Sequence, residues 1–197
     1  MAYNFFATIS RMKYIERWAL MRSSRPENIS EHSLEVAMIA HALCTIGNVR
    51  YGKHLSAERA AVIGLYHDAT EIITGDMPTP VKYFNPEIRS AYREVETMAR
   101  QRLLEGLPED LKPSYEAVFQ SREEEADREL RELVKAADKL SALIKCMEEE
   151  NAGNGEFRTA KQTIFTAVKE MAQTHPEVRD FIRDFMEPYG NTLDELL

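Results

Sequence analysis

Two histidines and two aspartates have residue types and spacing that could do chemistry. The dipeptide His67-Asp68 ends an apolar run at 60–66, His32 lies upstream, and Asp138 lies downstream in an apolar helical stripe. Two imidazoles and two carboxylates can close most of the coordination sphere of one divalent cation, with imidazole favouring transition metals and carboxylate keeping Mn, Co and Mg in play. With positions left open for water, such a site is typical of metal-assisted hydrolysis.

A structural role remains open for each histidine. Neighbouring residues on a helix point about 100° apart, so His67 and Asp68 can bind one ion only where the helix ends. The polar pair Thr70-Glu71 predicts such an end. The alternative is a capping histidine followed by an aspartate that starts the next turn. His32 could likewise be a core histidine with its hydrogen bonds satisfied.

Asp138 strengthens the metal interpretation. It follows Val134 by four residues and precedes Ser141 by three, so it borders the buried stripe of its helix. A carboxylate there needs a cation or several donors, because an unpaired buried charge is costly. An ion pair with Lys135 or Lys139 is the alternative, which we disfavour because adjacent residues face different sides of a helix. The set predicts a metal site without identifying the reaction.

Helices are expected to position these residues. Apolar residues recur at helical spacing over 5–15. Asn28 is predicted to cap the next helix, with Glu31 reaching back in a capping box, and Gly47 to end it. That places His32 in the first turn of a central helix. Ser56 is expected to cap a third helix, which leads directly into the His-Asp pair.

The rest of the chain is also read as helical, in one domain. Pro78 and Pro80 exclude a regular helix near that point, and Asn85-Pro86 starts one that reaches about residue 104. The other expected helices are a short piece between Pro108 and Pro113, a long helix over 123–149 whose acidic start Glu123-Glu124-Glu125 is solvated, and helices over 156–172 and 176–187. The prediction is an all-α single domain, 1–197, with a metal core at about 28–150 and C-terminal helices at about 156–187.

Composition restricts the partners. The chain has 197 residues, 44% apolar and 29% charged, with a net charge of −8. That charge disfavours binding to nucleic-acid polymers and anionic membranes, which basic surfaces hold. No segment has the length and apolarity of a membrane span, and the first residues do not resemble a signal peptide. Cys44 and Cys146 have no metal-site spacing and are expected to be reduced and buried. We expect a cytoplasmic protein.

The order His32, His67-Asp68, Asp138 on a helical chain resembles the HD-domain superfamily of metal-dependent phosphohydrolases. Four further segments are similar to the bacterial YfbR-type 5'-deoxynucleotidases, and the similarity weakens in the last 40 or so residues. Met77 stands where the resemblance leads us to expect leucine, which is also apolar. The segments are Arg17-Trp18, Ser30-Glu31-His32-Ser33-Leu34, Tyr66-His67-Asp68-Ala69 with Glu71, and Gly75-Asp76-Met77-Pro78-Thr79-Pro80-Val81-Lys82-Tyr83-Phe84-Asn85.

The resemblance implies hydrolysis of deoxyribonucleoside 5'-monophosphates to deoxynucleoside and phosphate, with selection against ribonucleotides. It implies one divalent cation, Co²⁺ or Mn²⁺ first, with Mg²⁺, Cu²⁺ or Zn²⁺ as alternatives. The implied roles are metal ligands (His32, His67, Asp68, Asp138), catalytic residues (Glu71 and the phosphate-orienting Arg17) and substrate contacts (Arg17, Trp18, His32, Asp68, Asp76, Met77, Pro78, Thr79, Asp138).

Two selectivity roles follow as hypotheses. Trp18 would wall the 2' face of the sugar, and Asp76 would accept a hydrogen bond from the 3'-hydroxyl. Otherwise Trp18 is a core residue, Asp76 a turn residue, and Glu71 an ordinary exposed glutamate.

The other histidines favour one metal. His41, His54 and His175 all lie outside the interval between Asp68 and Asp138, from which two-metal HD proteins draw further ligands. We expect His41 to be packed and His54 to lie in a surface loop.

The resemblance further implies a homodimer, for which the C-terminal helices could supply the interface. Rival functions are hydrolysis of a ribonucleotide or a signalling pyrophosphate, and a non-catalytic HD-like binding module.

Overall fold

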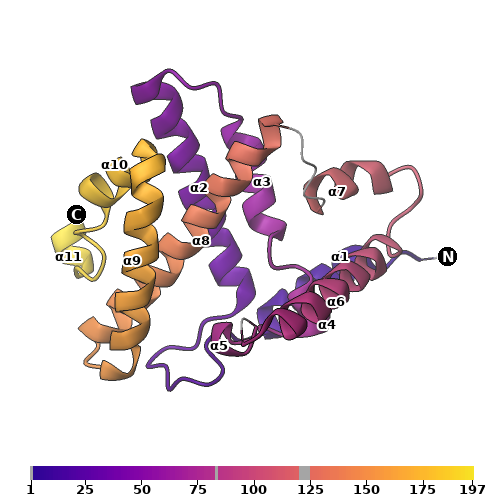
Figure 1. The fold of residues 1–197 in the computed structure, drawn as a ribbon, viewed down its shortest axis with the longest axis horizontal. Coiled ribbons are helices and arrows are strands. Elements are labelled where there is room, and N and C mark those ends of the chain that lie inside the picture. The colour runs from indigo at the N-terminus through magenta and orange to yellow at the C-terminus, as the bar shows by residue number, and fades with distance from the viewer. Residues whose placement is uncertain (1, 83, 120–124) are drawn as a thin grey trace.

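The computed structural model describes residues 2–82, 84–119 and 125–197, and the regular elements in these ranges are all helices joined by loops (Figure 1). The one β-bridge recorded among them joins Glu16 to Asn28. The all-α prediction is confirmed. The elements are α1 (Phe5–Ile9), the 3₁₀ helix η1 (Ser10–Tyr14), α2 (Ile29–Tyr51), α3 (Ala57–Tyr66), α4 (Glu71–Thr74), α5 (Thr79–Lys82), α6 (Pro86–Leu104), α7 (Lys112–Phe119), α8 (Glu125–Asn151), the 3₁₀ helix η2 (Gly155–Phe157), α9 (Arg158–Thr174), α10 (Pro176–Phe185) and α11 (Leu193–Leu196).

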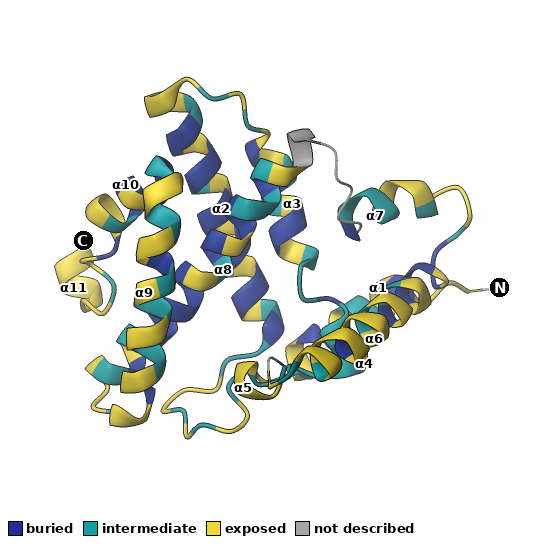
Figure 2. Cartoon of the chain, in the orientation of Figure 1, coloured by how far each residue is buried: buried dark blue, intermediate teal, exposed yellow. Residues whose placement is uncertain are grey.

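Two apolar clusters hold the helices together. The larger one joins α2, α3, α8, α9 and α10 around residues such as Leu43 and Leu140. The smaller one joins α1, η1 and the end of α6 around Phe5 and Leu103. Figure 2 shows buried residues concentrated on α2 and α8, with α9 and α10 exposing one side to solvent. The helical bundle therefore has a main core and a satellite core.

The predicted metal ligands lie where the two clusters meet. On α2, Ile29 belongs to the smaller cluster and Val36 to the larger, and His32 lies between them. At the end of α3, Ile63 belongs to the larger cluster and Ala69 to the smaller. His67-Asp68 falls in this interval. Packing on both sides therefore fixes the backbone that carries the ligands.

Close contact between α2 and α3 sets the distance between the two histidines. A Cβ atom at Gly64 would come within 2.9 Å of the Ala37 Cα, so only glycine allows this approach. Both residues are buried, and Gly64 precedes His67 by one helical turn. The α2–α3 hairpin thus brings the end of α3 against the first turns of α2.

The start of α2 follows the prediction and its end does not. The Asn28 side chain accepts hydrogen bonds from the backbone of Ser30 and Glu31, which confirms the cap. The Glu31 side chain instead lies 3.8 Å from the Arg25 guanidinium, so the predicted hydrogen bond from the Asn28 backbone back to Glu31 is wrong. The helix continues through Gly47 to Tyr51 and ends at Gly52, which has φ +64°. A glycine ends a helix where it adopts the left-handed conformation, and here Gly52 adopts it and Gly47 does not.

Other boundaries also differ from the sequence prediction. The first helix becomes 3₁₀ at Ser10, and α5 contains Pro80, which a first turn tolerates because its N–H needs no partner. Pro113 lies inside α7 instead of closing a helix. Glu123, Glu124 and Tyr83 lie outside the described residues.

The cysteines and the two outlying histidines of α2 and the following loop differ in their exposure. Cys44 and Cys146 are free and buried, and His54 is exposed, as predicted. His41 is exposed instead of packed, because it faces away from the core side of α2. Within the described part of the chain, no helix is both long and apolar enough to cross a membrane.

Candidate metal centre

His67 is oriented by its own helix. It is the C-terminal cap of α3, and its Nδ1 lies 2.7 Å from the carbonyl oxygen of Gly64. A carbonyl only accepts, so Nδ1 carries the proton and donates it. In the neutral imidazole the lone pair is therefore on Nε2, which faces Asp68 and not the helix. This is the tautomer a metal ligand needs.

His32 is oriented by α8. Its Nδ1 lies 2.9 Å from Ser141 Oγ, and that hydroxyl donates to Glu35 Oε2 at 2.5 Å. Because the serine proton is directed at Glu35, His32 Nδ1 donates to Ser141 and the lone pair lies on Nε2. His32 is completely buried. Its imidazole is thus fixed through two further side chains.

The carboxylates approach the same point. Asp68 Oδ2 is 3.0 Å from His67 Nε2 and 3.6 Å from His32 Nε2. Asp138 Oδ1 is 3.2 Å from His32 Nε2. Ligand atoms of His32, His67 and Asp68 all lie within 4.8 Å of one another, and Asp138 borders this group through its contact with His32.

This donor set fits a divalent cation. The Nε2 atoms of His32 and His67 are buried and, within the described residues, make no hydrogen bond. Two imidazole nitrogens without a hydrogen bond, beside two carboxylates, are the donor set of a transition-metal site. Burial and the nearby Arg17 charge lower the pKa of His32 and favour its neutral, ligating form. Burial also lowers the pKa of His67, but the Asp68 carboxylate outweighs it and raises that pKa to about 9.

Asp138 makes one ion pair that its sequence context disfavoured. Lys139 Nζ donates to Asp138 Oδ2 at 3.1 Å, so the lysine next in sequence does reach it. The long lysine side chain bends back to the carboxylate. Burial works to raise the pKa of Asp138, but the contact with His32 and the charge of Lys139 hold it well below its usual value. The other oxygen, Oδ1, still faces His32.

Glu71 lies beside this group, at the start of α4. Its side chain is half-buried and not exposed, and its buried Oε2 has no hydrogen-bond partner among the described residues. Burial, and then the carboxylates of Asp68 and Asp76, raise the pKa of Glu71 to about 9. An ordinary surface glutamate has neither property.

Arg17 and Trp18 approach from the N-terminal segment. Arg17 Nη2 is 4.0 Å from Asp138 Oδ1, and its guanidinium lies over the Trp18 ring at 5.5 Å. Trp18 is half-buried, so the alternative that it is simply a core residue is wrong. Burial raises the pKa of Asp76, opposed by the Arg17 charge and by a backbone hydrogen bond from Trp18. Asp76 therefore lies beside both residues.

The remaining predicted substrate positions follow Gly75, whose φ is +72°. Met77 and Pro78 are half-buried and Thr79 is exposed at the start of α5. Asp76 lies close enough to Arg17, Asp68 and the Trp18 backbone for these groups to change its pKa. For Met77, Pro78 and Thr79 it gives only their place on the adjoining loop.

The loop after Trp18 is anchored to the end of α8. Buried Glu149 accepts hydrogen bonds from the backbone N–H of Ser24 at 2.7 Å and from Lys145 Nζ at 2.5 Å. Lys145 also donates to the Arg25 carbonyl. Burial works to raise the pKa of Glu149, but Lys145 and Ser24 lower it to about 2. One buried ion pair thus holds the loop that continues to Glu27 and Asn28.

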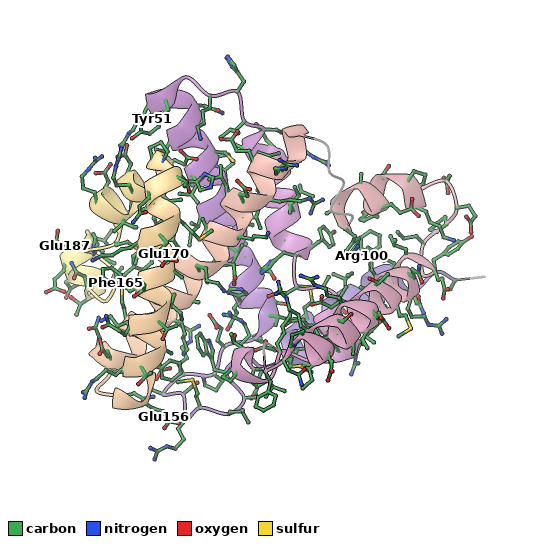
Figure 3. All side chains as sticks on the ribbon, viewed as in Figure 1. Tyr51, Arg100, Glu156, Phe165, Glu170 and Glu187 are labelled. Carbon is green, nitrogen blue, oxygen red and sulfur yellow. The ribbon has the colours of Figure 1, made fainter. Side chains whose placement is uncertain are left out.

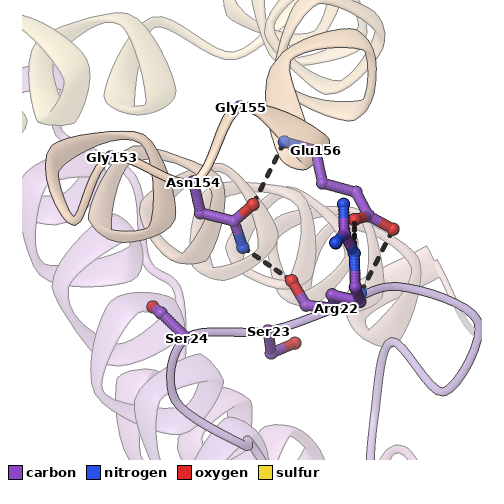
Figure 4. Close-up of a pocket in the computed structure, with 7 residues that line it drawn as sticks. All are labelled: Arg22, Ser23, Ser24, Gly153, Asn154, Gly155 and Glu156. Carbon is purple, nitrogen blue, oxygen red and sulfur yellow. Dashed lines mark hydrogen bonds and ion pairs between the residues drawn. The ribbon is translucent and has the colours of Figure 1, made fainter.

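A surface hollow lies over this anchor (Figure 4). Asn154 donates to the Arg22 carbonyl at 2.6 Å, and Arg22 Nε donates to Glu156 at 2.8 Å. Glu156 lies at the end of the molecule where η2 leads into α9 (Figure 3). The predicted ligand and catalytic residues are absent from the lining of this hollow, which is Arg22, Ser23, Ser24, Gly153, Asn154, Gly155 and Glu156.

Sequence reasoning missed three residues of this site. Glu27 accepts hydrogen bonds from both Arg17 and Trp18, while Ser141 and Glu35 orient His32. Ser141 lies three residues after Asp138, on the same face of α8, which was the available signal. Glu27 and Glu35 carried no signal, because their partners lie 10 and 106 residues away.

Comparison with known proteins gives concordant results. The family model described as 5'-deoxynucleotidase YfbR-like matches residues 4–189. A protein of Vibrio vulnificus (strain YJ016) named 5'-deoxynucleotidase is 46% identical over 196 residues, covering 98% of this chain and 97% of its own. One of the same name from Vibrio cholerae is 45% identical over 193 residues, covering 98% and 97%.

Solved structures agree on the fold. An HD-domain phosphohydrolase from Listeria innocua has a TM-score of 0.80 at 20% identity, covering 96% of this chain and 90% of its own. A cyanophage S-2L HD phosphohydrolase, bound to dA and one catalytic Zn²⁺ ion, has a TM-score of 0.65 at 22% identity, covering 94% and 96%. With a family model spanning most of its length and close relatives at 45–46% identity, the chain belongs to the YfbR-like 5'-deoxynucleotidase family.

Proposed function

We propose that this protein is a metal-dependent 5'-deoxynucleotidase, which hydrolyses deoxyribonucleoside 5'-monophosphates to deoxynucleoside and phosphate and selects against ribonucleotides. The observation that carries the proposal is the pair of orphaned Nε2 atoms of His32 and His67, facing Asp68 beside a cationic Arg17. Family membership supports the same chemistry.

His32, His67, Asp68 and Asp138 would hold one divalent cation, Co²⁺ or Mn²⁺ first. Both neutral imidazoles present Nε2, and the carboxylates add negative charge. When bound, the cation would supply Lewis acidity for phosphate and an acidified water. His32, Asp68 and Asp138 would thereby also lie against the substrate phosphate.

The chain's own residues would bind the phosphate and move the proton. Arg17 is 11% exposed and lies next to Asp138, so its guanidinium can orient a phosphate in a site with little bulk water. Glu71 would exchange a proton with the attacking water or the departing 5'-oxygen, because its buried Oε2 has no hydrogen-bond partner among the described residues.

Two residues would contact the sugar of the substrate, one at the 2' position and one at the 3'-hydroxyl. Trp18 would occupy the space that a 2'-hydroxyl needs. Asp76, linked to the Trp18 backbone, would accept a hydrogen bond from the 3'-hydroxyl. Met77, Pro78 and Thr79 would complete the wall at the nucleoside end.

A phosphate-release screen tests this function. Chelated protein is assayed with every deoxy- and ribonucleoside monophosphate after addition of each metal in turn. We expect release from the deoxynucleotides and much slower release from the ribonucleotides. No release from any monophosphate, or faster release from ribonucleotides, would contradict the proposal.

We further propose a cytoplasmic homodimer with a single catalytic domain over residues 1–197. The two free buried thiols suit a reducing compartment. Two surfaces are candidates for the dimer interface. One is the C-terminal region with exposed Phe185, and the other is the α2–α3 face with exposed Leu34 and Met38. Light scattering of Phe185→Glu and Met38→Glu would distinguish them, and a monomeric wild type would contradict the dimer.

A further inference from the structure

One carboxylate oxygen joins the two side chains proposed to read phosphate and sugar. Glu27 Oε2 accepts a hydrogen bond from Arg17 Nη1 at 2.5 Å and another from Trp18 Nε1 at 2.9 Å. The side chains of Arg17 and Glu27 are only 11% and 13% exposed. Charge-assisted bonds in such a setting are stronger than neutral or fully solvated ones.

The backbone fixes Glu27 opposite its partners. Arg17 N donates to the Glu27 carbonyl at 2.8 Å, and Ile29 N donates to the Ile15 carbonyl at 3.0 Å. These bonds flank the β-bridge between Glu16 and Asn28. The segment before Trp18 and the segment before α2 are therefore paired, and the Glu27 side chain is held at a set distance from both donors.

Trp18 needs this support because its backbone is in a disfavoured conformation. Its φ is +62°, the one positive φ of a non-glycine residue among those described. Such a conformation is costly for a bulky residue and persists only where surrounding contacts hold it. Three contacts hold the indole: the hydrogen bond to Glu27, the Arg17 guanidinium 5.5 Å from the ring centroid, and the buried Phe157 ring, whose centroid is 5.3 Å away.

We infer that Glu27 is a positioning residue that sets Arg17 and Trp18 together. Through one oxygen it would couple the orientation of the phosphate to the exclusion of a 2'-hydroxyl. When a substrate phosphate binds Arg17, the same carboxylate oxygen would keep the Trp18 indole against the sugar of that substrate. The inference rests on the proposed function and adds to it the residue on which sugar discrimination depends.

The test compares Glu27→Ala and Glu27→Gln with wild type. The first readout is the ratio of kcat/KM for dAMP to that for AMP, in which the fraction of folded protein cancels. The second is the emission of Trp18, which reports on one site because it is the only tryptophan. The control is Glu31→Ala, which removes a half-exposed glutamate from the same loop-helix junction. Bound metal is measured in every variant.

For Glu27→Ala we expect the dAMP/AMP ratio to fall about 10- to 100-fold, as expected for loss of a charge-assisted hydrogen bond. Trp18 emission should shift to longer wavelength while bound metal stays at the wild-type level. Glu27→Gln keeps an acceptor for the indole but loses the charge facing Arg17. It should therefore retain most discrimination and lose kcat/KM for dAMP. Glu31→Ala should match wild type.

An unchanged ratio and unchanged emission in Glu27→Ala would overturn the inference. If that variant does not fold, Trp18→Phe replaces it, because phenylalanine keeps a ring but cannot donate to Glu27. Discrimination equal to wild type in Trp18→Phe would then overturn the inference. Wild-type protein inactive on every deoxynucleotide would instead overturn the proposed function, whereas discrimination by wild type that survives in Glu27→Ala overturns only the role of Glu27.

Discussion

His32 and Ser141 are joined by a buried 2.9 Å hydrogen bond, and its direction determines which nitrogen of His32 can bind a metal. Since the Ser141 hydroxyl donates onward to Glu35, the imidazole must donate through Nδ1. This leaves Nε2 free toward Asp68 and Asp138. The tautomer of His32 is therefore set from α8, by a residue that is not itself one of the predicted metal ligands.

Ser141→Ala should weaken metal binding. With no acceptor for Nδ1, the other tautomer and other ring orientations become accessible, and loss of such a partner typically costs about 10- to 100-fold in affinity. Competition titration with a chromogenic chelator measures the effect. Ser33→Ala is the matched control, because Ser33 is as buried on α2 as Ser141 is on α8, but its hydroxyl has no hydrogen-bond partner in the part of the chain that the structure describes. Equal metal affinity in the two variants would contradict the role of Ser141 in fixing the tautomer of His32.

Glu71→Ala should retain metal and nucleotide and lose most turnover. A positioned proton-transfer group contributes about 10²- to 10⁴-fold, and Glu71 has an unpartnered oxygen beside the ligand group. Single-turnover rates and nucleotide binding are measured on the same preparation. Loss of bound metal would instead make Glu71 a ligand or a scaffold residue.

The metal-free protein should lose stability as pH rises. His67 and Glu71 both have a pKa of about 9, above their ordinary values of 6.5 and 4.5. The folded state then binds these protons more tightly than the unfolded state. The stabilisation is present below the ordinary values and is lost as pH rises toward 9. Thermal melts of chelated protein from pH 7 to pH 9, above the range in which the lowered pKa of His32 acts in the opposite direction, should show a falling Tm, and a rising Tm would contradict it.

Metal affinity should rise over the same pH range. The cation competes with the His67 proton, so binding releases a proton below pH 9. Calorimetry in buffers of different ionisation enthalpy measures the released protons. Binding without proton release at pH 7 would show that His67 is already neutral.

Glu149→Ala should destabilise the fold by about 3–5 kcal/mol, because it leaves Lys145 buried without its partner. Denaturant unfolding measures the change. Glu156→Ala is the control, since its partner Arg22 is 93% exposed and such a pair contributes at most about 1 kcal/mol. Similar losses in both variants would contradict the anchoring role of Glu149.

Local patterns predicted the helices and the residues that gather around His32, and long-range contacts decided the rest. The Asn28 cap and the end of α3 at His67 depend on neighbouring residues, so sequence could predict them. Gly47 was mistaken for a helix end because its buried position against the loop after Gly52 cannot be read from spacing. Glu27 joins Arg17 and Trp18 only once a backbone pairing brings the two segments together.

Activity measured against added cation tests the central claim most directly. Chelated wild-type protein is titrated with Co²⁺ or Mn²⁺ while phosphate release from dAMP is followed, with Asp68→Asn in parallel. The site of His32, His67, Asp68 and Asp138 predicts no activity before addition, saturation at one cation per chain for tight-binding conditions, and little recovery in the variant. Full activity without cation, or saturation only at two per chain, would contradict it.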